Sequence, residues 1–298
     1  MKKRGWIIYN GNLPGNKFLD YAQWIQEAAS KQDSQTIIIK NNELLSFLGT
    51  NQLELLAASK MELPDYVVFA DKDIYLARQL EQLGLRVFNS SHAIESSDDK
   101  ITTYQQLAIN KLPIPKTIIA PKIFATGRID SKSIEEAIGK LGFPMIIKEA
   151  FGSFGEQVYL VNSEEELNLK VLELQGKAFM FQEFVSSSYG RDMRLQVVGD
   201  KVVAAMKRTA ANDFRANVTA GGKMAAYQPT EQEEKLAILA TKAIEADFAG
   251  VDLLFGPDKN ALVCEINSNA HIHNMYDCTG INAADYIVEY ILGQPDDE

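Results

Sequence analysis

The sequence GVDLLFGPDKNALVCEIN, residues 250–267, contains two apolar runs separated by a turn signal. Each run has the length of a strand, and Gly256-Pro257-Asp258 is typical of a tight turn, so we expect strands at residues 250–255 and 261–266. Asp252 lies inside the first apolar run, where burying a carboxylate is costly unless it is paired or binds a metal. The two strands therefore predict a site for an ion or an ion pair.

The second strand would place a carboxylate and an amide side by side. Because side chains alternate between the faces of a strand, we expect Val263, Glu265 and Asn267 on one face and Cys264 and Ile266 on the other. Two carboxylates and an amide oxygen on adjacent strands suit Mg²⁺, which commonly binds one or two carboxylates together with phosphates and water. The alternative is that both carboxylates are rim charges, or partners of Lys and Arg residues elsewhere in the chain.

A glycine-rich loop precedes this region. Gly152-Ser153-Phe154-Gly155 follows a run that ends at Lys148, and backbone amides in such a loop could close over phosphate oxygens while the lysine neutralises their charge. The alternative is an ordinary hairpin with a surface lysine. The chain contains neither G-x-x-x-x-G-K-[ST] nor G-x-G-x-x-G, so it supports neither a P-loop NTPase nor a Rossmann dehydrogenase.

The N-terminal part alternates short apolar runs with amphipathic stretches. In order, these lie at residues 6–9, 18–29, 36–39, 44–48, 66–70, 74–83 and 86–88. This βαβα rhythm predicts a small parallel sheet covered by helices, with residues 44–48 in a helical position of the rhythm. Three prolines between residues 113 and 121 indicate a connection, so we place the first domain at residues 1–121.

The pattern then changes to that of two α+β units, which we place at residues 122–190 and 191–298. In the first unit we expect helices at 133–141 and 164–174 and strands at 144–148, 157–161 and 179–185. In the second, Gly199-Asp200 predicts a hairpin between strands at 194–198 and 201–206. Helices at 231–246 and 284–292 complete the expected elements.

Composition limits the classes of partner. The chain has 298 residues, 46% of them hydrophobic, and a net charge of −10, so we expect no nucleic-acid partner. Only Cys264 and Cys278 are present, too few for a disulfide framework. The first apolar run is too short for a signal peptide or a membrane span, so we expect a cytoplasmic protein without a membrane partner.

Taken in order, a series of short motifs resembles those of the ATP-grasp ligases. The series is Lys148 with Gly152-Ser153-Phe154-Gly155, Gln182-Glu183-Phe184-Val185, Arg191-Asp192-Met193-Arg194, Phe214-Arg215-Ala216-Asn217, Gly221-Gly222, Asp252 and Glu265-Ile266-Asn267. It is most similar to the branch that contains the ribosomal protein S6 glutamate ligase and the lysine-biosynthesis carrier-protein ligase. The resemblance covers about residues 95–292. It implies an α/β N-terminal parallel-sheet domain followed by a two-subdomain α+β ATP-grasp fold.

The resemblance also implies that ATP binds between the two subdomains. Lys100 and Lys148 would contact its phosphates and Asp192 its ribose side. The other nucleotide-binding residues implied are Gly152, Ser153 and Gly155 of the loop and Gln182, Glu183, Phe184 and Val185 of a hinge against the adenine.

The reaction implied by the resemblance is phosphorylation of a carboxylate by ATP to an acyl phosphate, followed by attack of an amine to form an amide. Mg²⁺ or Mn²⁺ held by Asp252, Glu265 and Asn267 would bridge the phosphates. Arg215 is the leading catalytic candidate, because phosphoryl transfer needs cations around the γ-phosphate; a surface position is the alternative. The further catalytic candidates are Lys207, Arg208 and Asn217.

The chain departs from the S6-ligase branch directly after the last motif. That branch has a short loop containing Pro and Gly, whereas residues 268–275 here include His271 and His273. We expect this loop to face the substrate, with histidines that bind a substrate carboxylate or titrate near neutral pH; polar filling is the alternative. Gly221 and Gly222 are further candidates for substrate contact. Residues 219–220 lack the His-Arg pair of the S6-ligase branch, so glutamate ligation to a ribosomal protein is not implied.

The first hypothesis is therefore an ATP- and magnesium-dependent carboxylate–amine ligase. Its substrates would be a small-molecule carboxylate and an amine, with a peptide or protein as an alternative acceptor, and the resemblance favours a homo-oligomer. A second hypothesis is a nucleotide-binding regulatory protein that keeps the ATP site without turnover. A third, a flavodoxin-like signalling module with an appended domain, rests only on the N-terminal rhythm.

Overall fold

The N-terminal part of the chain forms a parallel sheet. In this computed structural model, which describes residues 2–57, 61–124, 127, 129–153, 155–216 and 222–295, its strand order is β2-β1-β5-β6. The strands are β1 (Arg4–Tyr9), β2 (Gln35–Lys40), β5 (Tyr66–Ala70) and β6 (Val87–Phe88), with α1 (Lys17–Lys31) and α2 (Ile74–Gln82) as connections. Every residue of β5 is buried, as expected of a parallel strand covered on both faces. The predicted N-terminal α/β domain is confirmed.

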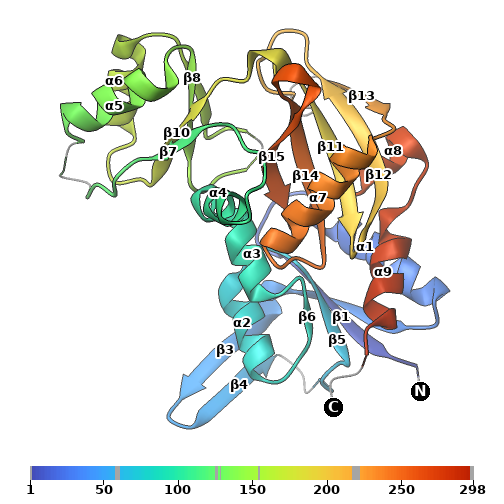
Figure 1. Cartoon of the computed structure of the whole chain (residues 1–298). Coiled ribbons are helices and arrows are strands. Elements are labelled where there is room, and N and C mark those ends of the chain that lie inside the picture. The colour runs from blue at the N-terminus through green and yellow to red at the C-terminus, as the bar shows by residue number, and fades with distance from the viewer. Residues whose placement is uncertain are drawn as a thin grey trace.

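The prediction of a helix at residues 44–48 is wrong, because these residues form a strand. After the short 3-10 helix η1 (Asn41–Glu43), the chain forms a hairpin of β3 (Leu44–Gly49) and β4 (Gln52–Ala57) that projects from the body (Figure 1). Gly49 pairs with Gln52, so the turn is Thr50-Asn51, and Asn51 has a positive φ of 59°. Asn tolerates this left-handed conformation, so the turn reverses the chain where a helix would have continued.

Two antiparallel sheets follow (Figure 1). The first has the order β7-β10-β8-β9: β7 (Thr117–Ile119), β10 (Phe179–Glu183), β8 (Met145–Glu149) and β9 (Val158–Val161), with α5 (Ser131–Leu141) and α6 (Glu164–Glu173). The second has the order β13-β12-β11-β14-β15: β13 (Lys223–Ala226), β12 (Lys201–Thr209), β11 (Arg191–Val198), β14 (Phe248–Phe255) and β15 (Ala261–Asn267). The predicted Gly199-Asp200 hairpin is confirmed, with Val198 paired to Lys201.

Helices cover both faces of the five-stranded sheet. α7 (Glu231–Ala243) packs on one face, and α8 (His273–Thr279) packs on the other against β12 and β13. α9 (Ala283–Gly293) packs against α1, so the last helix shares a core with the N-terminal sheet. The remaining elements are α3 (Ser91–Asp98), α4 (Lys100–Ile109), η2 (Ser186–Ser188) and η4 (Pro257–Lys259). The sequence pattern did not predict α3, α4 or α8.

The arrangement in two subdomains expected after the N-terminal domain is confirmed by these two sheets. The boundaries at residues 121 and 190 remain proposals, and β7, which precedes residue 121, already pairs with β10. Asn89 connects the parts of the chain, since its buried amide donates to the backbone oxygens of Phe248 and Ser268. Within the described residues, none of the helices is both long and apolar enough to span a membrane.

Candidate active site

An interlocked group of ion pairs occupies the face of the five-stranded sheet opposite α7. Arg194 forms a two-bond pair with Asp252, at 2.6 Å and 2.7 Å. Arg208 donates to Asp192 at 2.7 Å and 2.5 Å and also lies 2.8 Å from Asp252. The four side chains come from three adjacent strands and are paired in register, Asp192 with Arg208 and Arg194 with Asp252. Asp252 is thus paired with arginines. This is the alternative to a metal site that the sequence left open.

The two carboxylates differ in electrostatics. Burial, only partly offset by Arg208, raises the pKa of Asp192 to about 6. Burial also opposes ionisation of Asp252, but Arg194 and Arg208 outweigh it and hold the pKa of Asp252 below its ordinary value. Asp252 is therefore the firmly ionised member of the pair, and Asp192 titrates close to neutral pH.

A β-bulge corrects the expected alternation along β15. Asp252 pairs with Glu265, but the next residue of β14, Leu253, pairs with Val263, so Cys264 is an extra residue in the ladder. Val263 and Ile266 consequently both point into the α7 core, with 0% and 1% of their surface exposed. The expectation that these two residues lie on opposite faces is wrong, whereas Glu265 and Asn267 still share a face.

Two buried lysines lie beside the bulge. Lys148 on β8 has its Nζ 3.3 Å from the hydroxyl of Tyr104 and 3.7 Å from Sγ of Cys264. Burial works against its charge, but the neighbouring Cys264, Tyr104 and Glu265 outweigh burial and raise the pKa of Lys148. Lys100, the first residue of α4, is also buried, and burial lowers its pKa although Glu265 partly counteracts this. The structure brings together both lysines assigned to phosphate binding.

The glycine-rich loop is held from two sides. Lys100 Nζ donates to the carbonyl of Gly152 at 2.7 Å, and Lys72 Nζ of the N-terminal domain lies 3.3 Å from Oγ of Ser153. Gly152 has a φ of 136°, and a Cβ there would collide with the side chain of Gln157. Phe154 lies outside the described residues. The turn at Gly152 therefore requires glycine, and closure of the loop over phosphates stays a prediction.

Arg215 connects the two subdomains. Its Nη1 donates to the carbonyl of Gly155 at 2.6 Å, while its other guanidinium nitrogens pair with Asp213 at 3.0–3.2 Å. The structure thus brings the leading catalytic candidate to the glycine-rich loop. Asn217 and Gly221 lie outside the described residues, and Gly222 is half-buried.

Lys207 is not brought to this group. Neighbouring residues of a strand face opposite ways, and Arg208 faces the ion-pair group. Lys207 pairs with Met193 of the α7 core, and its Nζ lies 5.3 Å from the ring centre of Phe255 on that side.

The predicted hinge, residues 182–185, begins in the last two residues of β10. Gln182 is buried and donates to the hydroxyl of Thr117 at 2.8 Å. The carboxylate of Glu183 accepts from the backbone N–H of Lys116 at 2.9 Å, so this carboxylate stabilises the strand pairing. The last two hinge residues follow directly: Phe184 packs edge-on against Tyr189 and Phe214, and Val185 precedes η2.

The histidines after β15 meet a residue that sequence reasoning missed. Asp20 on α1 accepts from His273 at 3.1 Å and lies 3.9 Å from His271. The two imidazoles are stacked with ring centres 6.3 Å apart, and Trp24 of α1 lies 5.3 Å from His273. The hydrogen bond to Asp20 raises the pKa of His273. No signal near either histidine pointed to a partner more than 250 residues away.

A second missed group lies at the carboxyl end of the parallel sheet. Asp71, directly after β5, accepts from the amide of Asn10, directly after β1, at 3.1 Å. Its backbone carbonyl accepts from Asn269 at 2.8 Å. Burial raises the pKa of Asp71. The sequence signal that could have indicated this group is a polar residue directly after each parallel strand, because ligands of such sheets bind at this edge.

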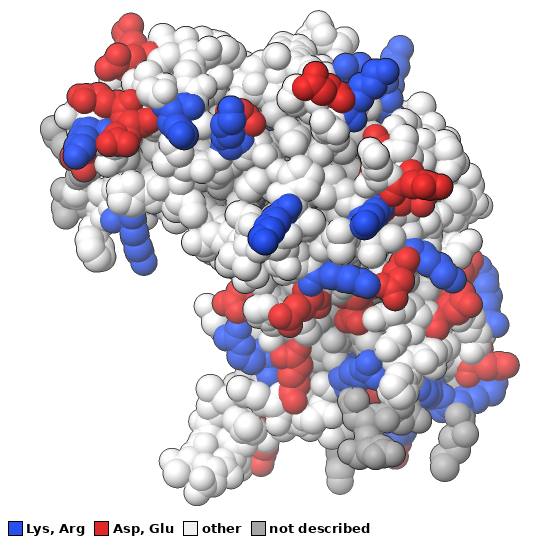
Figure 2. Space-filling view, viewed as in Figure 1, with Lys and Arg blue, Asp and Glu red and all other residues white. Residues whose placement is uncertain are grey.

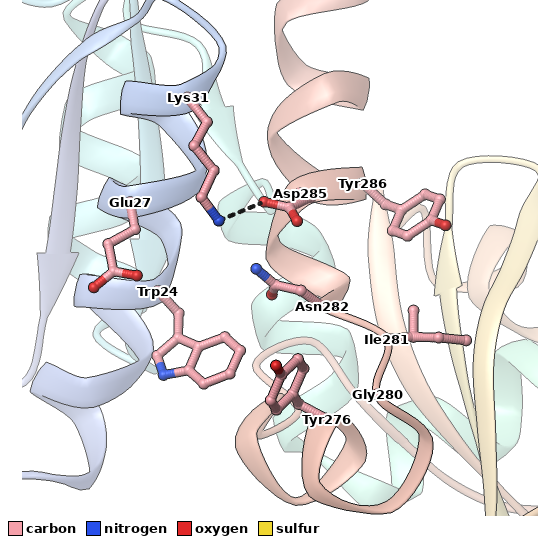
Figure 3. Close-up of a pocket in the computed structure, with 9 residues that line it drawn as sticks. All are labelled: Trp24, Glu27, Lys31, Tyr276, Gly280, Ile281, Asn282, Asp285 and Tyr286. Carbon is pink, nitrogen blue, oxygen red and sulfur yellow. Dashed lines mark ion pairs between the residues drawn. The ribbon is translucent and has the colours of Figure 1, made fainter.

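Beyond the histidines, a cavity of about 590 Å³ opens between α1 and the segment containing α8 and α9 (Figure 3). Trp24, which contacts His273, also stacks edge-on with Tyr276 at 4.9 Å. The lining residues are Trp24, Glu27, Lys31, Tyr276, Gly280, Ile281, Asn282, Asp285 and Tyr286. The cavity therefore adjoins the histidine pair and is separate from the ion-pair group.

The donor set fits Mg²⁺ in part. Glu265 lies opposite Asp252, and the amide nitrogen of Asn267 is buried with no hydrogen-bond partner among the described residues. Asp252 is already held by two arginines and would have to share its oxygens. In the part of the chain that the structure describes, no three His, Cys, Asp or Glu side chains form a metal-binding group. Phosphates and water would have to complete an octahedral shell.

Residues 97–291 match the family model described as the RimK-like ATP-grasp domain. The chain belongs to the RimK-like ATP-grasp family. This membership confirms that it is an ATP-dependent carboxylate–amine ligase, of a family that uses ATP and Mg²⁺. The comparisons give no support to the alternative of a regulatory protein without turnover.

Similar proteins agree with this assignment. A Mycoplasma pneumoniae protein named "Uncharacterized protein MG012 homolog" is 33% identical over 253 residues, covering 81% of this chain and 84% of that protein. A Legionella pneumophila (strain Corby) protein named "Probable alpha-L-glutamate ligase" is 36% identical over 217 residues, covering 72% and 69%. The solved ATP-grasp ligase PsnB, in complex with a precursor variant, Mg and ADP, matches with a TM-score of 0.69 at 16% identity, covering 98% of both chains. That likeness shows the ATP-grasp fold.

Proposed function

We propose that this RimK-like ligase binds the phosphates of ATP between the glycine-rich loop and the ion-pair group. The observation that carries the proposal is an excess of positive charge among the buried and partly buried side chains of the site. The cations are Lys100, Lys148, Arg194 and Arg208, and the carboxylates are Asp192, Asp252 and Glu265. A buried cation without a counter-charge is costly, so a polyphosphate would complete the site electrostatically.

Glu265, Asn267 and Asp252 would hold the metal ion against these phosphates. When bound, Mg²⁺ or Mn²⁺ would neutralise charge on the transferring phosphoryl group. The two arginines already hold Asp252 ionised and in one orientation, because Arg194 binds both of its oxygens. We assign Arg208 the role of positioning the two aspartates, with Asp192 toward the ribose.

Arg215 would offset the charge that develops at the γ-phosphate. In the first step an oxygen of the substrate carboxylate bonds to the γ-phosphorus as the bond to the leaving ADP oxygen breaks. In the second, the amine attacks the carbonyl carbon of the acyl phosphate, loses a proton and expels phosphate. The contact between Arg215 and Gly155 places this guanidinium at the loop that would cover the phosphates.

The substrates would bind where the loop after β15 meets the N-terminal domain. Asn269 contacts the backbone of Asp71, and the histidine pair contacts Asp20, so residues from both halves of the chain converge there. We propose an amino acid or peptide as substrate. Glutamate is the first amino acid to test, because the names of relatives from Legionella pneumophila and Danio rerio, "Probable alpha-L-glutamate ligase" and "Beta-citrylglutamate synthase B", share it. A protonated His273 could pair with its side-chain carboxylate.

The test is ADP release with MgATP and a panel of amino acids, each paired with amines or peptides, followed by mass spectrometry of the products. We expect an amide product and a loss of kcat of about 100-fold or more in Arg215→Ala. Arg191→Ala is the matched control, because its exposed guanidinium donates to the carbonyl of Ser187 and lies 4.9 Å from the ring centre of Phe255, on the α7 side of the sheet. ATP binding without turnover in any pairing would instead favour a regulatory protein.

A further inference from the structure

Gln196 on β11 is a buried carboxamide whose oxygen has no partner. Only 2% of its surface is exposed, and its Oε1 accepts no hydrogen bond from the described residues. Polar groups on the surface bond to water, as the interspersed positive and negative side chains on the α7 side of the molecule do (Figure 2). A buried polar atom without a partner destabilises a protein, and in native structures such an atom often serves a catalytic role or binds an ordered water.

The strand register places Gln196 beyond the ion-pair group. Leu195 and Val197 are buried in the α7 core, so Gln196 faces the opposite side of the sheet together with Arg194. The residues of β11 on this side are Asp192, Arg194 and Gln196, spaced about 7 Å apart. Asp192 is assigned to the ribose and Arg194 holds a carboxylate of the proposed metal site. Gln196 therefore continues the line past the phosphates of ATP.

A glycine separates Gln196 from a second unpartnered polar atom. Gly250 pairs with Gln196 on one side and with Asn267 on the other. The Oε1 of Gln196 lies 3.6 Å from the position that a Cβ on Gly250 would occupy, and Cβ of Ala270 lies 2.4 Å from it. Across the glycine, the amide nitrogen of Asn267 is also buried without a partner among the described residues. An acceptor and a donor thus flank Gly250, beneath Ala270.

The two atoms match the two groups that an amide-forming ligase must bring together. An amine offers N–H donors, which the oxygen of Gln196 can accept, whereas this oxygen would repel a carboxylate. A carboxylate or an acyl phosphate offers acceptor oxygens, which the amide nitrogen of Asn267 can bind. The alternative is that one ordered water bridges both atoms, because a buried water needs two to four polar partners.

We propose that Gln196 binds the incoming amine, with its Oε1 accepting an N–H, while Nδ2 of Asn267 donates to an oxygen of the activated carboxylate. The inference rests on the proposed ATP site and names the residue that binds the second substrate. Because Oε1 lies beneath Ala270, the loop of residues 268–270 shifts when the amine enters, as substrate loops do.

Gln196 orients the amine and takes no proton. With one N–H held by Oε1, the lone pair of the neutral amine is free to attack the carbonyl carbon of the acyl phosphate. The C–N bond forms as the C–O bond to phosphate breaks, and the departing phosphate takes the proton that the amine loses. A neutral carboxamide is too weak a base to accept that proton.

The first arm of the test is thermal unfolding of the free protein, which needs no substrate. Gln196→Met removes the unpartnered oxygen at similar volume, so its Tm should equal or exceed that of the natural protein. Gln79→Met is the matched control, because Gln79 is 3% exposed and donates to the carbonyl of Glu54 at 3.4 Å. This control should have a lower Tm. A Gln196→Met protein with a clearly lower Tm would show that an ordered water or the fold satisfies Gln196, and would overturn the proposal.

The second arm measures ADP release with MgATP, L-glutamate as the carboxylate and glycinamide as the amine. Gln196→Met should lower kcat/KM for glycinamide at least about 10-fold and leave KM for ATP within about twofold, because about 1.4 kcal/mol of binding is tenfold. Gln196→Glu keeps an acceptor oxygen and should recover most of this loss. Gln79→Met should match the natural protein.

An unchanged kcat/KM for glycinamide in Gln196→Met, or an equal loss for glycinamide and ATP, would contradict a role in amine binding. A natural protein that releases no ADP with any pairing would count against the proposed function. The thermal comparison would then still decide whether Gln196 is held by the fold or left for a ligand.

Discussion

Replacing Arg208 with Met should destabilise the protein in a way that depends on pH. Arg208 donates both hydrogen bonds to Asp192, at 2.7 Å and 2.5 Å, whereas Asp252 keeps its two bonds from Arg194. The variant therefore leaves one buried carboxylate without its donor. Met keeps an unbranched apolar stem in place of that of Arg and removes the guanidinium, so the change in packing is confined to the end of the side chain.

The magnitude follows from the pKa of Asp192. At about 6 it already lies above the ~3.9 of an unfolded aspartate, so folded Asp192 costs stability as the pH rises through 6. Loss of Arg208 should raise this pKa by roughly two further units, to a value near 8, which corresponds to about 2 kcal/mol of stability at pH 8. Near pH 5.5 Asp192 is largely protonated even in the natural protein. The electrostatic loss should then fall to about 0.2 kcal/mol.

Urea unfolding at both pH values measures this difference, with Arg191→Met on the same strand as the exposed control. The control should lose less than about 1 kcal/mol at either pH, because the exposed guanidinium of Arg191 contacts a neutral carbonyl, that of Ser187, and the ring of Phe255, and no carboxylate depends on it. A loss in Arg208→Met that is small at pH 8, or equal at the two pH values, would refute the view that Arg208 keeps Asp192 ionised.

Two further predictions concern the substrate loop. A Cβ on Gly250 would collide with Cβ of Ala270, so Gly250→Ala should displace the loop, cost about 1–3 kcal/mol in urea unfolding and lower kcat/KM; Gly139→Ala, which meets no atom within 4 Å, should be neutral or stabilising. Asp20→Asn should lower the pKa of His273 measured by NMR, because the hydrogen bond to Asp20 raises it. The stabilisation from this contact is full below the ordinary histidine pKa and is lost as the pH rises through the raised value, so the variant should differ from the natural protein only on the acidic side. An unchanged titration of His273 would show that the contact does not form in solution.

Most elements could be predicted because their signals are local. The apolar runs and turn residues of 250–267 predicted β14 and β15, and Gly199-Asp200 predicted the β11–β12 hairpin. The order of the motifs also sufficed to identify the family, because that order survives where each motif alone is weak. The family resemblance implies one phosphate site for Lys100 and Lys148, and these two lysines lie close enough to interact electrostatically.

The errors arose where the decisive contact is distant in the sequence. Residues 44–48 have an apolar pattern compatible with a helix, and only pairing with residues 53–57 makes them a strand. The bulge at Cys264 depends on the register with β14, which alternation within one strand cannot reveal.

The sequence by itself therefore determined the reaction class and most of the elements, because strand periodicity, turn chemistry and motif order are properties of the linear chain. Only the tertiary structure decided the electrostatic state of the site. Asp252 is held by arginines from β11 and β12, and His273 meets Asp20 from α1. A carboxylate has the same letter in the sequence whether a metal, an arginine or water faces it, and its partner is chosen by strand pairing and packing across the whole chain.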